Sequence, residues 1–345
     1  MIFKVNPRNP QKNIIKKAAE IIKKGGLVVF PTETVYGLGA NALNPKAVRK
    51  IFKAKGRSLN NPLIIHICQK KDLLFLAKNI PEEARFLAEK FWPGPLTLIL
   101  EKKEIVPDEV TAGRKTVAIR MPAHKTALAL IRASGVPIAA PSANLAGRPS
   151  PTDAGHALND LGGKADLIID AGQTRIGLES TVLDLTQKPF TILRPGEITK
   201  EQIEKIIGKI EIWRPGSQSV IKSPGMKYRH YAPKAKLFLI EYDNVIGLTD
   251  VVRGLIQKHK KKGKKVGAMA TKETSHLYNE ADLVLSLGSR KNFKIIAKNL
   301  FKTLRLFDEN KIDVILAESF SEKGLGQAIM NRLSKAADAV LKIKK

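Results

Sequence analysis

The chain has 345 residues, of which 43% are hydrophobic, so it can build packed cores and is not an intrinsically disordered polymer. Its 60 Lys and Arg residues against 32 Asp and Glu give a formal net charge of +28, which attracts polyanions such as ATP or RNA, or else reflects a solvated lysine-rich surface. Cys68 is the only cysteine, which excludes intrachain disulfides and cysteine-built zinc clusters. We also find no signal-peptide core and no apolar run of membrane length, so we expect a cytoplasmic protein without a membrane anchor.

Predicted helices and strands alternate through residues 1–208. The first helix carries Ile14, Ile15, Ala18 and Ile22 on one face. We predict helices over 11–24, 45–54, 81–91, 123–133 and 199–208, and strands over 27–30, 62–67, 96–100, 116–120, 137–140, 166–170, 181–185 and 190–193. This alternation predicts an α/β domain, and the close spacing of the last two strands indicates a hairpin and therefore a mixed sheet.

A second, smaller domain is predicted over residues 236–345. We expect an ordered linker over 209–235, because 214–234 are rich in Pro, Gly and Ser and show no periodicity. The alternation then resumes, with strands over 236–240, 265–270, 282–287 and 313–316, and helices ending near 258 and spanning 291–307 and 325–341. This pattern predicts a small doubly wound unit. It lacks a G-x-G-x-x-G fingerprint, so we predict no dinucleotide there.

Polar motifs follow several predicted strands of the first domain. They are PTETVYGLG at 31–39, KAKGRSLNNPL at 53–63, TVAIRMP at 116–122, PSANLAG at 141–147, ESTVLD at 179–184 and LRPG at 193–196. Loops beyond strand ends are where α/β proteins bind ligands. Clustered Lys and Arg suit a triphosphate, and an Arg at a strand end suits a carboxylate. Taken singly, each motif is equally compatible with a polar loop, a solvated basic turn or a surface ion pair.

Other signals narrow the chemistry. The basic motif lacks the glycine spacing of a Walker loop, and Ser142 lacks the G-x-S-x-G elbow of a nucleophile. The six histidines form no H-x-H or H-E-x-x-H pair, which argues against a transition-metal site built by the protein. His66 lies in an apolar strand, where a core histidine is the default interpretation.

The order and wording of these motifs together resemble the YrdC/Sua5 family of threonylcarbamoyl-AMP synthases over roughly residues 10–200. The segment SPGMKYRHYAP at 223–233, followed by another α/β unit, resembles the longer Sua5 form. The resemblance implies an open twisted mixed sheet with a concave basic cavity, plus a smaller Rossmann-like Sua5 domain.

The resemblance also implies roles for individual residues. Lys55 and Arg57 would act on the phosphates and are the expected catalytic residues. The expected threonine-binding residues are Thr34, His66, Arg120, Ala140 and Ser180. The expected ATP-binding residues are Arg57, Asn61, Thr116, Ser142, Asn144, Ser150, Arg194 and Tyr231, with Tyr231 closing over the nucleotide from the linker.

The implied reaction joins L-threonine, bicarbonate and ATP into threonylcarbamoyl-AMP and pyrophosphate, and a separate transferase complex then modifies adenosine 37 of tRNA. The threonine N-carboxylate would attack the α-phosphate, so cations and Mg²⁺ carried by ATP suffice, without a covalent enzyme intermediate or protein metal ligands. No organic cofactor is expected, and direct tRNA contact is left open. A linker that folds over the cavity would exclude water from the labile intermediates.

Two alternatives remain open at this stage. A non-catalytic tRNA- or double-stranded-RNA-binding protein would explain the charge of +28 and the KHKKKGKK run at 258–265. Carbamoyl-adenylate chemistry, as in the YrdC-like domain of hydrogenase maturation proteins, would require zinc-finger and acylphosphatase segments that this chain lacks.

Overall fold

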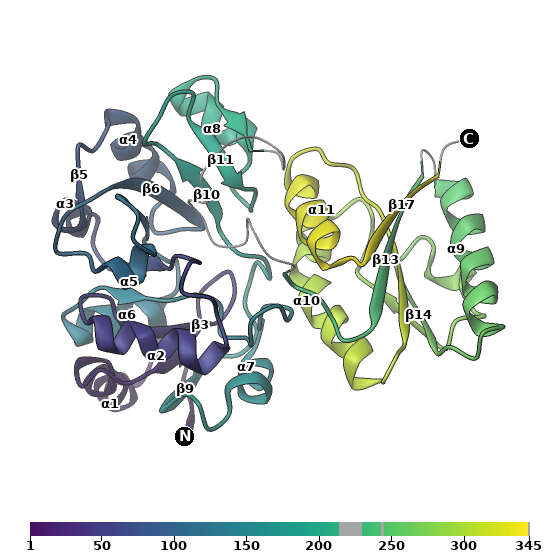
Figure 1. The fold of residues 1–345 in the computed structure, drawn as a ribbon, viewed down its shortest axis with the longest axis horizontal. Coiled ribbons are helices and arrows are strands. Elements are labelled where there is room, and N and C mark those ends of the chain that lie inside the picture. Colours follow the sequence, from purple (N-terminus) through teal and green to yellow (C-terminus); the bar gives the residue numbers. More distant parts are fainter. Residues whose placement is uncertain (214–229, 243–244, 344–345) are drawn as a thin grey trace. The chain divides into compact units, whose positions relative to one another are not determined.

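The described residues of the computed structural model form two compact units, which Figure 1 shows in purple to teal and in green to yellow. The structure describes residues 1–213, 230–242 and 245–343. The first unit holds 1–146 and 150–213, and the second holds 147–149, 230–242 and 245–343. The part of the predicted linker at 214–229 lies outside the described residues, so the lid stays a prediction.

The first unit is built on one mixed sheet of twelve strands. Their order is β1-β9-β2-β3-β8-β4-β7-β6-β10-β11-β12, with β5 beside β6. The strands are β1 (Ile2–Lys4), β2 (Val28–Phe30), β3 (Gly37–Asn41), β4 (Ile64–His66), β5 (Ala77–Lys78), β6 (Leu96–Lys102), β7 (Thr116–Arg120), β8 (Ile138–Ala139), β9 (Leu167–Asp170), β10 (Thr181–Asp184), β11 (Thr191–Arg194) and β12 (Glu211–Ile212). β10 and β11 are antiparallel, which confirms the predicted hairpin and the mixed sheet.

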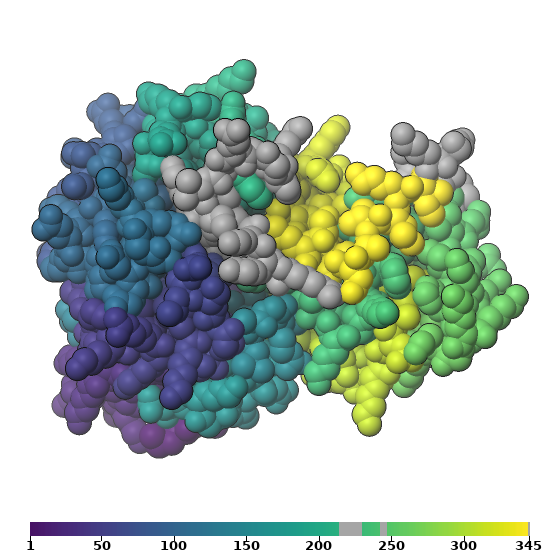
Figure 2. All heavy atoms as spheres, in the orientation of Figure 1, coloured from purple at the N-terminus to yellow at the C-terminus, as the bar shows by residue number. Residues whose placement is uncertain are grey.

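Amphipathic helices cover this sheet. They are α1 (Lys12–Lys23), α2 (Pro45–Lys55), α3 (Leu73–Leu76), α4 (Glu82–Phe91), α5 (Asp108–Thr111), α6 (Lys125–Ser134), α7 (Ala154–Leu161) and α8 (Lys200–Ile207). The side chain of Asn44 caps the start of α2, and Gly56 ends the helix with a left-handed φ of 62°. These two signals place Lys55 at the last position of α2. In the space-filling view, the atoms of the first unit, in purple to teal, form a closely packed face (Figure 2).

The side chains on the two faces of the central strands belong to different apolar clusters. Val117 and Ile119 of β7 belong to the main core of the unit, while Ala118 belongs to a small apolar cluster on the other face. That cluster consists of Ile64, Ile99, Ala118, Val182 and Leu193, with Trp213 packed against it. Because side chains alternate along a strand, Arg120 shares the face of Ala118. The small cluster is therefore an apolar floor beside the charged end of β7.

β3 was not predicted, because most of it lies in the PTETVYGLG motif, which we interpreted as a polar loop beyond a strand end. A side chain at Gly39 would meet Ile138 Cγ2 at 2.7 Å and a ring carbon of Phe30 at 2.8 Å. The strand therefore uses glycine because its neighbours pack against the bare backbone. α5 and α7, like the short edge strands β1, β5 and β12, were also missed, since segments of two to eight residues carry little periodicity.

The second unit is a five-stranded parallel sheet with helices, which confirms the four strands predicted there and adds a fifth. Its strand order is β15-β14-β16-β13-β17. The elements are β13 (Lys236–Tyr242), α9 (Val245–Lys260), β14 (Val266–Ala270), β15 (Leu283–Ser286), α10 (Phe293–Glu309), β16 (Val314–Glu318), α11 (Leu325–Ala336) and β17 (Ala339–Ile343). The two sheets confirm the predicted fold class.

The predicted helix over 325–341 was wrong at its end. α11 stops at Ala336, and β17 follows as a fifth strand that pairs with β13. Val340 and Leu341 lie in register with Leu239 and Ile240. The apolar residues near the C-terminus therefore belong to the outermost strand of the sheet and not to one face of a helix. The sequence pattern could not show this, because the pairing partner lies about a hundred residues away.

Candidate active site

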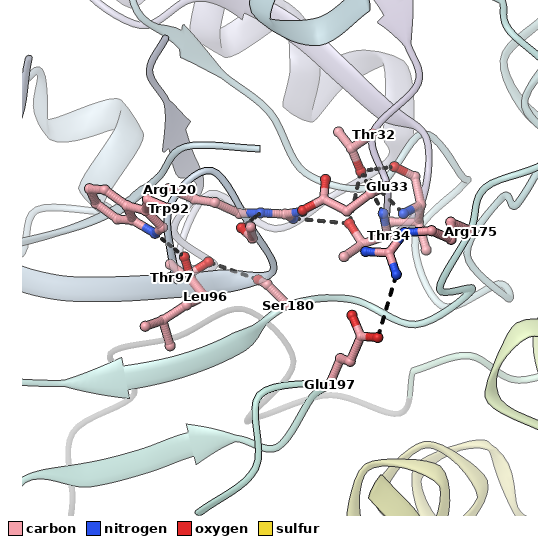
Figure 3. Close-up of polar contacts among 12 residues, drawn as sticks. Thr32, Glu33, Thr34, Trp92, Leu96, Thr97, Arg120, Arg175, Ser180 and Glu197 are labelled. Carbon is pink, nitrogen blue, oxygen red and sulfur yellow. Dashed lines mark hydrogen bonds and ion pairs between the residues drawn. The ribbon is translucent and has the colours of Figure 1, made fainter. Parts of the chain in front are cut away.

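Several predicted site residues meet where the central strands of the first sheet end. We call this end of the strands the edge that carries the site. His66 ends β4 and Arg120 ends β7, and the two are register partners in a parallel pair. β6 runs antiparallel to β7 and parallel to β10, which brings Thr97 and Ser180 to the same edge. The loop after β2 adds Thr34, as Figure 3 shows. The topology thus gathers residues that are up to 146 positions apart in the sequence, as the span from Thr34 to Ser180 shows.

Arg120 is the centre of this group. Its side chain is only 4% exposed. Its Nε donates to the carbonyl of Gly94 at 3.2 Å, and its Nη1 donates to Thr34 Oγ1 at 2.9 Å. Nη2 lies 2.7 Å from Glu33 Oε1, outside hydrogen-bond geometry, and has no hydrogen-bond partner. A buried guanidinium with N–H groups to spare can bind a carboxylate.

The loop after β2 is shaped by Thr32. Its hydroxyl accepts from the backbone N–H groups of Thr34 at 3.2 Å and Val35 at 3.3 Å. It also lies 2.8 Å from Thr34 Oγ1. This hydroxyl-closed turn directs both Glu33 and Thr34 toward Arg120 (Figure 3).

A second arginine holds Ser180. Arg194 donates through Nε to the carbonyl of Ser180 at 3.0 Å and through Nη2 to its hydroxyl at 3.1 Å. Ser180 Oγ also lies 2.7 Å from Thr97 Oγ1. The hydroxyl of Ser180 is therefore fixed from two sides. Arg194, predicted to bind ATP, is placed here beside a predicted threonine-binding residue.

His66 is buried at the same edge, with the ring of Phe30 edge-on at 6.0 Å. Its Nδ1 has no hydrogen-bond partner. Burial, together with the positive charge of Arg120, lowers the pKa of His66 from 6.5 to about 3. His66 is therefore neutral at physiological pH and can exchange one hydrogen bond with a ligand without adding charge.

The acid sensitivity of folding should change when His66 is replaced. Because its folded pKa lies near 3, the unfolded histidine takes up a proton below about pH 6.5 while the folded one does not. The folded state with neutral His66 is therefore favoured above that pH. As the pH falls from there toward 3, the free energy of unfolding decreases by about 1.4 kcal/mol per pH unit. When the pH is lowered from 7 to 5, the free energy of unfolding measured with urea should fall by roughly 2 kcal/mol more in wild type than in His66→Gln. Equal losses would contradict a buried, neutral His66.

The predicted phosphate residues form a neighbouring group. The ammonium of Lys55 donates to the carbonyls of Ser142 and Asn144, and Lys55 is 2% exposed. Arg57 donates to the carbonyls of Asn61 at 3.2 Å and Pro62 at 2.9 Å. Lys55 thus joins the KAKGRS and PSAN motifs, although it lies 87 residues before Ser142 in the sequence. Asn61 is buried with its Oδ1 unpartnered.

Ala140 and the PSAN segment run beside these groups. The N–H of Ala140 donates to the carbonyl of Ile64 at 2.9 Å, so only its carbonyl is left for a ligand. Ser142 is half-buried and bridges to Gly37 of β3. Ser150 donates to Glu179, which makes both part of one buried contact.

Of the remaining predicted site residues, Thr116 lies away from Arg120 and Tyr231 belongs to the second unit. Thr116 begins β7, opposite Glu101 of β6, and four residues of extended strand place it about 13 Å from Arg120. There it lines a hollow with Lys78, Lys102, Arg114 and Lys115. Tyr231 belongs to the second unit, where its buried ring stacks on Phe301 at 5.2 Å. Their predicted contacts with ATP stay predictions.

Sequence reasoning missed Thr32 and Glu33, which lie inside the PTETVYGLG motif, and Thr97, which lies in the predicted strand over 96–100. Each is at most 3% exposed. A buried polar residue next to a predicted ligand residue was the available signal. Within the described part of the chain, no group of three or more His, Cys, Asp or Glu could hold a metal ion, and no helix has the length and apolarity that crossing a membrane requires.

Comparison with known proteins assigns this arrangement to a family. A family model named for Sua5, YciO and YrdC and described as "Telomere recombination" matches residues 20–196, and one described as "Threonylcarbamoyl-AMP synthase, C-terminal domain" matches 198–338. The chain belongs to the Sua5/YrdC family. The two matches together also show the long Sua5 form.

Relatives of the Sua5 family are similar over nearly the whole chain. The threonylcarbamoyl-AMP synthase of Pyrococcus abyssi is 55% identical, with 94% of each chain covered. That of Bacillus subtilis is 52% identical, covering 94% of this chain and 92% of the relative. The crystal structure of P. abyssi Sua5 complexed with L-threonine matches 100% of both chains at 52% identity, with a TM-score of 0.94.

Proposed function

We propose that this protein is an L-threonylcarbamoyladenylate synthase. It would join L-threonine, bicarbonate and ATP into threonylcarbamoyl-AMP and pyrophosphate, for a downstream transferase complex that modifies adenosine 37 of tRNA. Relatives at 55% and 52% identity carry the name threonylcarbamoyl-AMP synthase, and one similar structure holds L-threonine. The observation that carries the proposal is the buried edge where Arg120, Thr34, His66 and Ser180 converge.

The site residues would divide the work between the two substrates. Arg120 would bind the threonine carboxylate, while the hydroxyls of Thr34 and Ser180 and the neutral ring of His66 would orient the amino acid. Lys55 and Arg57 would balance the charge that builds on the phosphate oxygens as pyrophosphate leaves. All of these residues except the half-buried Arg57 are buried, so their electrostatic interactions are screened less than they would be in water.

Metal chemistry would enter with the nucleotide. The described residues offer no cluster of three or more metal-ligating side chains, so we expect Mg²⁺ to arrive as the MgATP substrate. Arg57, Asn61, Ser142 and Asn144 would then hold the nucleotide mainly by hydrogen bonds and charge. No covalent bond to the chain is needed, because the N-carboxylate of threonine is itself the nucleophile.

The proposal predicts strictly coupled substrate use. Purified protein given ATP, Mg²⁺ and labelled bicarbonate should release pyrophosphate only when threonine is present, and the label should appear in a carbamoyl-adenylate. The other amino acids, tested singly, should give little product, with serine as the nearest control because it lacks only the methyl group. Tight, salt-sensitive tRNA binding without threonine-dependent ATP consumption would instead support the RNA-binding alternative.

A further inference from the structure

We propose that Glu33 and Arg120 together bind the amino-acid substrate as a zwitterion, with Glu33 taking the α-ammonium and Arg120 the carboxylate. The inference rests on the proposed function for the presence of an amino acid. It adds Glu33 as the group that selects for an amine.

Glu33 has an unusual environment for a buried carboxylate. Its side chain is 2% exposed, and Figure 3 shows it pointing toward Arg120. Oε1 lies 2.7 Å from Arg120 Nη2, yet neither Oε1 nor Oε2 has a hydrogen-bond partner among the described residues. Its backbone is fixed, because its carbonyl accepts from the N–H of Ile176 at 2.9 Å.

Buried carboxylates are normally satisfied by hydrogen-bond donors, because an anion without them loses its hydration at a large cost. Glu33 has a positive charge beside it but no N–H or O–H aimed at its oxygens. A substrate ammonium would supply three donors and a charge. The unpartnered Nη2 of Arg120, in turn, has donors for a carboxylate. The pair is thus complementary to the two charged ends of an amino acid.

A second buried glutamate in the same chain, paired with a partly exposed arginine, shows what a fully hydrogen-bonded Glu–Arg pair looks like. Glu318 of the second unit is 1% exposed, and its Oε2 accepts from Arg290 Nη2 at 2.6 Å. Its Oε1 accepts from Tyr278 Oη at 2.6 Å. Both oxygens of Glu318 are therefore satisfied within the protein. Glu33, in contrast, has no hydrogen-bond donor on either oxygen, and it lies at the edge where threonine is expected to bind.

Neighbouring groups do not replace Glu33 in this role. His66 is neutral and lies on the Arg120 side, and Glu179 is engaged by Ser150. His124 is near enough for the charge of Glu33 to raise its pKa, although its own burial lowers that pKa more strongly. Glu33 is therefore the negative charge available to an ammonium beside Arg120.

The test compares two ligands that differ only at the α-position. L-threonine and its 2-hydroxy analogue, in which a hydroxyl replaces the amine, would be titrated by calorimetry into full-length wild type and Glu33→Gln. We expect wild type to bind threonine about 10- to 100-fold more tightly than the analogue, the range of a charged hydrogen bond. Glu33→Gln should reduce that ratio to near one. A merely structural Glu33 would weaken both ligands alike and leave the ratio unchanged, which would overturn the inference.

Glu318→Gln is the matched control, because it also removes the charge of a buried glutamate that is paired with an arginine. It should lower stability as Glu33→Gln does but keep the wild-type ligand ratio. If Glu33→Gln does not fold, the test is the ratio of the wild-type affinities for threonine and the 2-hydroxy analogue. A ratio near one overturns the inference. A wild type that binds no threonine and releases no pyrophosphate would sink the proposed function itself. An active wild type whose Glu33→Gln variant keeps the preference would sink this inference alone.

Discussion

Replacing Arg120 with methionine is expected to weaken threonine binding by about 2–5 kcal/mol, the cost of removing one partner from a buried charged contact. The same change leaves Glu33 buried without its counter-charge, so the free energy of unfolding should fall by about 3–5 kcal/mol. Calorimetric titration and urea unfolding measure the two effects separately. Arg120 lies at the end of β7, where it contacts Gly94, Thr34 and Glu33, so its replacement removes a partner from all three.

A double variant separates folding from binding at this position. Arg120→Met combined with Glu33→Gln removes both buried charges, so most of the lost stability should return while threonine binding stays lost. Near-normal threonine binding in Arg120→Met would contradict the placement of the carboxylate. Binding that returned in the double variant would contradict it as well.

Replacing Lys55 with methionine should lower threonine-dependent pyrophosphate release by about 100- to 1000-fold, the usual effect of losing one preorganised donor at a developing charge. The methionine keeps the apolar stem but leaves the carbonyls of Ser142 and Asn144 without the ammonium. Each carbonyl left unpartnered costs about 1–3 kcal/mol. The variant should therefore lose the positive charge of Lys55, and the PSAN segment should also lose its fixed position.

Lys53→Met is the matched control, because Lys53 lies two residues earlier in α2 and is exposed. It should leave the rate of pyrophosphate release within a factor of two or so, as surface substitutions usually do. A Lys55→Met variant that kept more than about a tenth of the wild-type rate would contradict a role for Lys55 at the phosphates.

Much of the fold followed from the sequence because its signals are local. The apolar face of α1, the helical span of α2 and the closely spaced strands β10 and β11 are all encoded within short windows, and the structure agrees with them. β3 and β17 were missed for the opposite reason. Their pairing is set by distant partners, Ile138 beside the bare backbone of Gly39 and β13 beside Leu341.

The site was predicted unevenly for the same reason. The motifs identified Thr34, Arg120 and Ser180, and the family resemblance added His66. The strand register brings these four to one edge. They gave no sign that Thr32 closes a turn that also directs Glu33 toward Arg120. Thr116 was named from its motif alone, although the antiparallel pairing of β6 and β7 places it at the far end of the strand.

The most direct test is a crystal structure of this chain grown with L-threonine at a concentration well above its dissociation constant. We expect the threonine carboxylate on Arg120 Nη2, its ammonium on Glu33 and its side chain toward Thr34, Ser180 or His66. Threonine bound elsewhere, or none at this edge under conditions where calorimetry shows saturation, would contradict the site.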